Sequence, residues 1–114
     1  MKIQMHQGLT QERWSKFSFL EQMANIGSEV IRTINCKKKG DLDLSQRCFF
    51  CALELIDMTI ADTKNKKGTL KEHCRTREAL VDNFMYDNEY NTTDEIWYNY
   101  FFQFNYAAAL ERGR

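Results

Sequence analysis

The cysteines and one histidine supply side chains that bind transition metals. Cys48 and Cys51 are separated by two residues, and His73 directly precedes Cys74. Thiolates and imidazoles are the ligands of structural zinc sites. On a helix, Cys48 and Cys51 project about 60° apart and can face the same neighbouring helix. The alternative is that Cys48 and Cys74 are small core residues, as unpaired cysteines usually are. We favour this alternative and predict no metal ion and no other cofactor.

His73 and Arg77 lie one helical turn apart, a spacing at which the two side chains can bind one anion. Arg77 also lies in the middle of an apolar arc that comprises Leu70, Cys74, Val81 and Phe84. A guanidinium in such an arc requires a carboxylate partner, because an unpaired buried charge is strongly destabilising. We favour a structural ion pair, and the candidate partners of Arg77 are Glu29, Glu54 and Asp57.

Basic residues also cluster before and within the third predicted helix. Such clusters contact nucleic-acid phosphates, and the candidate contact comprises Lys64, Lys66, Lys67, Lys71, His73, Arg75 and Arg77. The whole chain has 16 Lys and Arg residues and 16 Asp and Glu residues, so its formal charge is zero. This balance argues against a protein that coats nucleic acid or binds membranes through basic residues.

Sequence signatures of enzymes are lacking. The chain contains no glycine-rich phosphate loop, no nucleophile elbow and no His-Glu-x-x-His motif. Its acidic residues fall on the outer arcs of the predicted helices, so they do not form the inward carboxylate pairs of di-metal bundles. We therefore favour a non-enzymatic protein and name no catalytic residue.

The chain also resembles HEPN proteins, small helical bundles that include RNA-cleaving toxins. That family carries an arginine that is followed a few residues later by a histidine. Neither His6 nor His73 has an arginine in the few residues before it. The resemblance therefore implies, as the alternative function, a nucleic-acid-associated or toxin-like helical protein without the catalytic motif of that family.

Four segments with helical periodicity must position these side chains. The predicted helices cover residues 18–39, 42–61, 69–86 and 93–112. Short connections make consecutive helices antiparallel neighbours, so we predict an all-α, up-down-up-down four-helix bundle over residues 18–112. Residues 1–17 form an N-terminal arm with one large anchor, Trp14.

Local signals support these helix boundaries. Capping patterns predict the helix starts, at Ser18, Asp43, Thr69 and Thr92. Gly40 follows the first predicted helix, where a left-handed residue is favoured. Gly27 lies on the inward side of that helix, where a missing side chain lets a neighbouring helix approach closely.

The last predicted helix is unusually aromatic. Residues 96–110 carry no charge, and seven of the ten residues from 97 to 106 are aromatic. One stripe, which is predicted to face the core, comprises Trp97, Phe101, Phe104 and Ala108. A helix that is apolar nearly all round is covered on more than one side. Phe50 is also an aromatic residue on a polar arc. The predicted partner or oligomer interface therefore comprises Phe50, Ile96, Tyr98, Phe102, Tyr106 and Leu110.

These observations lead to a set of expectations about compartment and function. The N-terminus lacks the apolar segment of a signal peptide, so we expect a cytoplasmic protein with reduced thiols. Residues 96–110 are too few and too polar to span a bilayer, so no membrane partner is expected. The favoured function is a small self-associating bundle that serves as an interaction module or assembly subunit, with a homo-oligomer or protein partner. The alternatives are the nucleic-acid-associated protein and a thiol metal-binding bundle.

Overall fold

The computed structural model describes residues 8–113, apart from the side chains of residues 66–69. The described residues form helices and no strand, which confirms the all-α prediction. The elements are α1 (Gln11–Ser15), α2 (Phe19–Lys38), α3 (Leu42–Ala61), the 3₁₀ turn η1 (Thr63–Asn65), α4 (Lys66–Met85) and α5 (Asp94–Arg112). The four long helices correspond to the four predicted segments.

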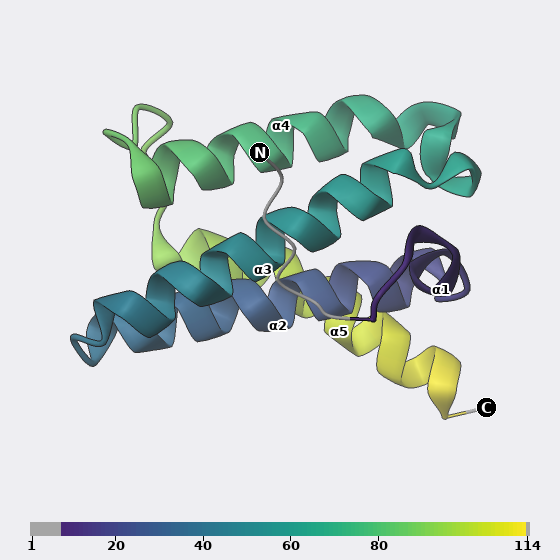
Figure 1. The fold of residues 1–114 in the computed structure, drawn as a ribbon, viewed down its shortest axis with the longest axis horizontal. Coiled ribbons are helices and arrows are strands. Elements are labelled where there is room, and N and C mark those ends of the chain that lie inside the picture. The colour runs from purple at the N-terminus through teal and green to yellow at the C-terminus, as the bar shows by residue number, and fades with distance from the viewer. Residues whose placement is uncertain (1–7, 114) are drawn as a thin grey trace.

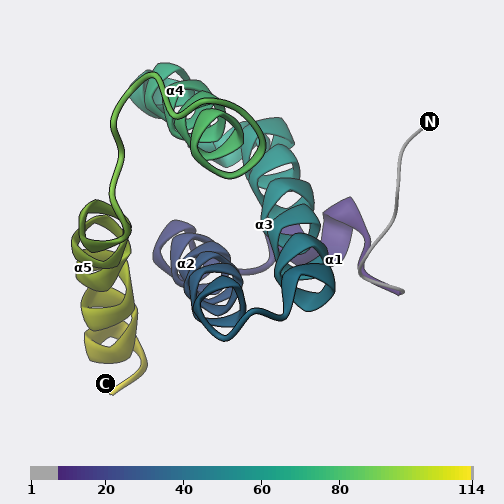
Figure 2. The same cartoon turned by 90° about the vertical axis from the view of Figure 1, so that its left-hand side faces the viewer.

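The helix α2 lies at the centre of the arrangement. It packs against α3 on one side and against α5 on the other, while α4 and the short α1 both pack against α3 (Figures 1 and 2). Figure 1 shows the long helices following one another back and forth along the molecule. This arrangement is compatible with the predicted antiparallel four-helix bundle, which stays a prediction. None of the described helices combines the length and apolar composition that a bilayer crossing requires.

The capping prediction is confirmed at α2. The Ser18 hydroxyl accepts from the backbone N–H of Glu21, and the Glu21 carboxylate accepts from the backbone N–H of Ser18. The two reciprocal bonds satisfy N–H groups that the first helical turn leaves without partners. Gly40 follows the end of α2 with φ +84°, which confirms the predicted left-handed residue.

The other three predicted cap positions are wrong by a few residues. The structure instead places the N-caps at Asp41 for α3, Asn65 for α4 and Thr93 for α5. At α5 the reason is visible in the preceding loop: the Asn88 side chain bonds both the N–H and the carbonyl of Thr92. These contacts hold Thr92 in the loop, so the helix begins one residue later.

Gly27 sets the closest approach between α2 and α5. A Cβ atom built on Gly27 would lie 2.7 Å from the Cβ of Phe101, closer than real Cβ contacts come. The Phe101 ring therefore occupies the space that a side chain at this position of α2 would take. The prediction that Gly27 admits a neighbouring helix is confirmed.

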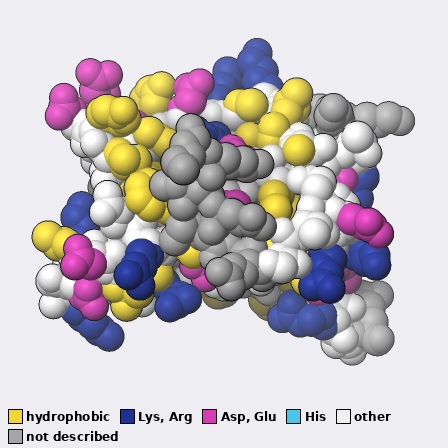
Figure 3. Space-filling model, viewed as in Figure 1, with side chains coloured by type: hydrophobic (Ala, Val, Ile, Leu, Met, Phe, Trp, Pro, Cys, Tyr) yellow, Lys and Arg dark blue, Asp and Glu magenta, His cyan; other side chains and the backbone are white. Residues whose placement is uncertain are grey.

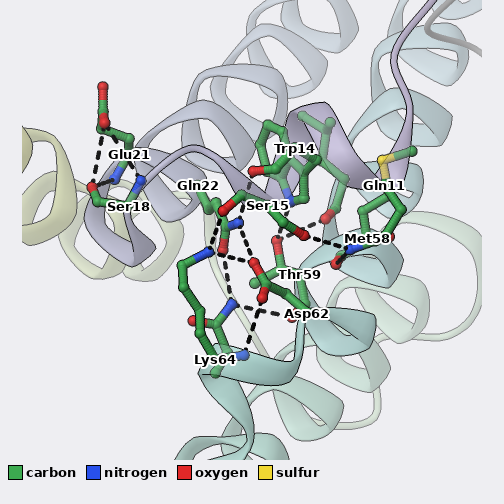
Figure 4. Close-up of polar contacts among 12 residues, drawn as sticks. Gln11, Trp14, Ser15, Ser18, Glu21, Gln22, Met58, Thr59, Asp62 and Lys64 are labelled. Carbon is green, nitrogen blue, oxygen red and sulfur yellow. Dashed lines mark hydrogen bonds and ion pairs between the residues drawn. The ribbon is translucent and has the colours of Figure 1, made fainter.

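Trp14 anchors the described part of the N-terminal arm. Its ring is buried, and its indole N–H donates to the Thr59 hydroxyl of α3 at 3.0 Å (Figure 4). Thr59 in turn donates to the carbonyl of Leu55, one turn earlier in α3. The only large aromatic side chain between residues 8 and 16 thus supplies both apolar area and a specific bond. The division of the chain after residue 17 stays a prediction.

Candidate interaction surface

One face of α5 covers the core as its periodicity predicts. Trp97, Phe101 and Ala108 are buried, and Phe104 is half-buried against the same core. The Trp97 and Phe101 rings stack at a centroid distance of 6.1 Å. These residues recur every three or four positions, which places them on one side of the helix, toward α2. The predicted inward stripe is therefore confirmed.

The opposite face of α5 exposes four large apolar side chains, which we call the α5 surface. The exposed fractions are 50% for Ile96, 64% for Phe102, 60% for Tyr106 and 52% for Leu110. The Phe102 and Tyr106 rings stack on each other, with centroids 6.3 Å apart and an interplanar angle of 18°. Single exposed apolar residues are ordinary, but a contiguous uncharged group of them is typical of an interaction site.

The fold leaves the α5 surface without cover from the described residues. Figure 2 shows α5 at the edge of the molecule, with α2 beside it and no helix beyond it. The described helix of the N-terminal arm, α1, packs against α3 and not against α5. The aromatic residues of α5 are thus divided between a covered face and an open one.

Two predicted interface residues are engaged within the chain. Tyr98 is half-buried: its hydroxyl donates to the Asn35 side chain at 3.2 Å, and the Lys38 ammonium lies 5.4 Å from its ring centroid. Phe50 is also half-buried and packs against the core. Helices pack on more than one side of α3, so its covered face is wider than the single arc that a helical wheel assumes. These two residues therefore lie outside the α5 surface.

The candidate metal ligands are not brought together. Cys48 is buried on α3, whereas Cys74 is exposed on α4. Among the described residues, no group of three or more His, Cys, Asp or Glu side chains is placed to hold a metal ion. Burial raises the pKa of Cys51 to about 11 and also raises the pKa of Cys48, so both thiols are held protonated.

Arg77 pairs with Asp57, one of its three candidate carboxylate partners. Its Nε lies 2.7 Å from Oδ1 of Asp57 on α3, and both side chains are about two-fifths exposed, at 39% and 43%. The expectation of a buried guanidinium is wrong, because α4 turns His73 and Leu80 toward the core instead. Leu70 and Cys74, which belong to the predicted apolar arc, are exposed. A pair at the surface avoids most of the desolvation that a buried pair would cost.

His73 is enclosed rather than available to an external anion. It is 4% exposed, its ring centroid lies 5.3 Å from that of Phe19, and its Nε2 has no partner among the described residues. Burial lowers the pKa of His73, while the charge of Glu72 opposes this shift. The structure thus separates His73 from Lys71 and Arg75, which are exposed on the same helix.

The His73 site predicts a pH-dependent stability. The free imidazole titrates near pH 6.5, and the folded chain binds its proton less readily. The unfolded state therefore binds more protons as the pH falls below 6.5, so the free energy of unfolding decreases in that range and is unaffected above it. We expect His73→Leu to flatten this dependence in urea denaturation at a series of pH values. An unchanged pH profile would show that His73 is not its source.

The lysine cluster is only partly available to a ligand. The Lys64 ammonium donates to the carbonyl of Ser15 at 3.0 Å and pairs with the buried carboxylate of Asp62 (Figure 4). The side chains of Lys66 and Lys67 lie outside the described residues. On the face in Figure 3, basic side chains are scattered and interspersed with acidic ones, without a continuous basic area.

A buried polar network that the sequence analysis did not single out joins α1, α2 and the turn after α3. The Gln22 amide donates to the Trp14 carbonyl at 3.0 Å and to the Asp62 carboxylate at 2.9 Å. The same side chain accepts from the Asn65 amide at 2.8 Å. Burial raises the pKa of Asp62, but hydrogen bonds from Lys64 and Gln22 outweigh it, so the pKa lies below its ordinary value. These residues are distant in sequence, and their polar groups pair with one another, which is typical of a structural network.

The α5 surface is thus the described feature that is best suited to an external partner. Comparison of this chain with protein families, characterised proteins and solved structures finds no match.

Proposed function

We propose that this chain is a non-enzymatic helical bundle that self-associates and serves as an assembly subunit or interaction module. In this proposal the four long helices form the antiparallel up-down-up-down bundle, and α5 is its contact helix. The observation that supports it is the α5 surface, where four large apolar side chains are each at least half exposed. No charged residue interrupts this helix between Ile96 and Leu110.

A second copy is the partner that these properties favour. Burial of apolar area provides most of the free energy of association, and aromatic side chains contribute most per residue. A surface without charges can face an identical surface without placing like charges opposite each other. The arrangement requires no further component, because each copy supplies the same side chains.

We expect light scattering on the purified protein to give a mass of two or more chains of 13.6 kDa each. Replacing Phe102 and Tyr106 together with alanine is expected to shift this mass to that of the single chain, because the two stacked rings form the centre of the α5 surface. Circular dichroism is expected to show unchanged helix content, since both side chains point away from the core.

The control for this experiment is Leu42→Ala. Leu42 is 65% exposed, as Phe102 is, but it lies in the first turn of α3. We expect this variant to keep the mass of the parent protein. A parent protein that remains a single chain at high concentration, or an alanine pair that keeps the oligomer mass, would contradict the proposal.

The nucleic-acid alternative is tested in the same experiment. An ultraviolet spectrum across the eluting peak shows whether nucleic acid accompanies the protein. Charge reversal at the exposed Lys71 and Arg75 removes two basic side chains of α4 that, among the described residues, are open to a phosphate. Nucleic acid that accompanies the parent chain but not this variant would favour the alternative function.

A further inference from the structure

We propose that two copies of the chain pair through α5 in antiparallel orientation, about a twofold axis that passes near residue 104. This inference rests on the proposed self-association and specifies the register of its interface. Three observations support it: the spacing of exposed residues along α5, the symmetry of that spacing, and the charges at the two ends of the helix.

The exposed residues of α5 follow the spacing of a helix-pairing seam. Asn99, Phe102, Tyr106 and Ala109 are all exposed and are separated by three, four and three residues. This alternation places side chains in one line along a helix that contacts a second helix. Ile96 and Leu110 flank the seam on one side and are half exposed. The seam thus has two aromatic residues at its centre and aliphatic residues near its ends.

The seam has the same spacing when it is read in either direction. Phe102 and Tyr106 are equally far from residue 104, and so are Asn99 and Ala109. An antiparallel copy centred there places Phe102 against Tyr106 of the second copy, and the twofold axis repeats this contact. The large rings then face each other, and the polar amide of Asn99 faces the small side chain of Ala109. In the same register, Ile96 lies beside Leu110 of the second copy.

The end charges of α5 favour the antiparallel orientation. Glu95 is exposed in the first turn of the helix, and Arg112 is exposed in the last turn. Antiparallel pairing brings Glu95 of one copy toward Arg112 of the other at both ends of the seam. Parallel pairing would place the two Glu95 carboxylates together and the two Arg112 guanidinium groups together. Like-charge contacts of this kind select against the wrong orientation.

Cysteine cross-linking tests the register directly. Ile96→Cys and Leu110→Cys are made as separate variants in a Cys74→Ser background, which removes an exposed native thiol. Copper phenanthroline oxidises pairs of thiols to disulfides, with oxygen as the electron acceptor. In the antiparallel register, an equal mixture of the two variants is expected to form covalent dimers that link position 96 of one copy to position 110 of the other. Peptide mapping of the dimer band identifies the linked positions.

Each variant alone is expected to give little covalent dimer. In the antiparallel register the two copies of position 96 are separated by roughly 24 Å along the helix axis, and the two copies of position 110 by roughly 18 Å. A disulfide requires Cα atoms within about 7 Å, so this separation prevents the bond. Covalent dimers of Ile96→Cys alone in which peptide mapping finds position 96 linked to position 96 would show parallel pairing and would overturn the inference.

Light scattering on the same samples before oxidation separates this inference from the proposed function. If the samples are oligomeric but the mixture forms no 96–110 cross-link, self-association is supported and the antiparallel register is wrong. A single-chain mass contradicts both. Both substituted side chains are half exposed, so the helices of each variant are expected to form. Circular dichroism of each variant checks this.

Discussion

Replacing Phe101 with alanine is expected to lower the free energy of unfolding of the single chain by about 3–5 kcal/mol. Phe101 is fully buried, and its ring packs against those of Trp97 and Tyr100. Its Cβ also lies where a side chain on Gly27 would be, so α2 and α5 meet at this residue. Alanine leaves a cavity between two helices that the surrounding backbone can close only in part. Urea denaturation followed by circular dichroism measures the loss.

Phe102→Ala is the matched control, because it removes the same side chain one position along the same helix. Phe102 is largely exposed, so its loss is expected to change the stability of the single chain by less than about 0.5 kcal/mol. The comparison is made at a protein concentration where light scattering gives the single-chain mass, since Phe102 also belongs to the proposed interface. Equal losses in the two variants would show that α5 does not pack with Phe101 inward.

Replacing Gln22 with leucine is expected to lower the free energy of unfolding by about 3 kcal/mol, although the two side chains are similar in size. Gln22 is completely buried, and its amide bonds Trp14, Asp62 and Asn65. Leucine removes a partner from each of these buried polar groups, and water cannot reach them to replace it. Thermal and urea unfolding both report the loss.

Gln11→Leu is the control for this second substitution. Like Gln22, Gln11 donates a hydrogen bond from its side-chain amide to another helix: its acceptor is the carbonyl of Met58 on α3, at 2.8 Å. Unlike Gln22, its side chain is exposed. Water replaces the lost bond there, so a change below about 1 kcal/mol is expected. If the Gln22→Leu variant were as stable as the Gln11→Leu variant, the buried network of Gln22 would not stabilise the fold.

The Gln22 variant also has an expected pH signature. Asp62 has a lowered pKa in the folded chain, so its contribution to stability is present above its ordinary pKa of 3.8. That contribution is lost as the pH falls through the folded pKa. Because Gln22 is one of the groups that lower this pKa, Gln22→Leu is expected to reduce the acid-dependent part of the stability.

Much of the local structure could be predicted from the sequence because its causes lie within a few residues. The capping box of Ser18 and Glu21 and the left-handed Gly40 both depend on neighbouring residues in the chain. The buried stripe of α5 follows from the spacing of Trp97 and Phe101 alone. Periodicity and short-range hydrogen bonds are read directly from residue order.

Other features depend on which elements meet. Gln22 bonds Asp62, which lies forty residues later in the chain, and no local pattern relates the two positions. Phe50 is half-buried because α3 is covered on several sides, and His73 rather than Arg77 points inward because of how α4 packs. A helical wheel describes one helix and contains no information about its neighbours.

The sequence by itself therefore determined the all-helical class, the positions of the four long helices and the unusual apolar character of α5. Only the tertiary structure decided that the opposite face of α5 lies open, because α5 packs against α2 on its other side and the short α1 docks against α3 instead. The physical reason is the range of the interactions involved. Helix formation depends on contacts within about four residues, whereas the exposure of a face depends on packing between segments that are distant in the chain.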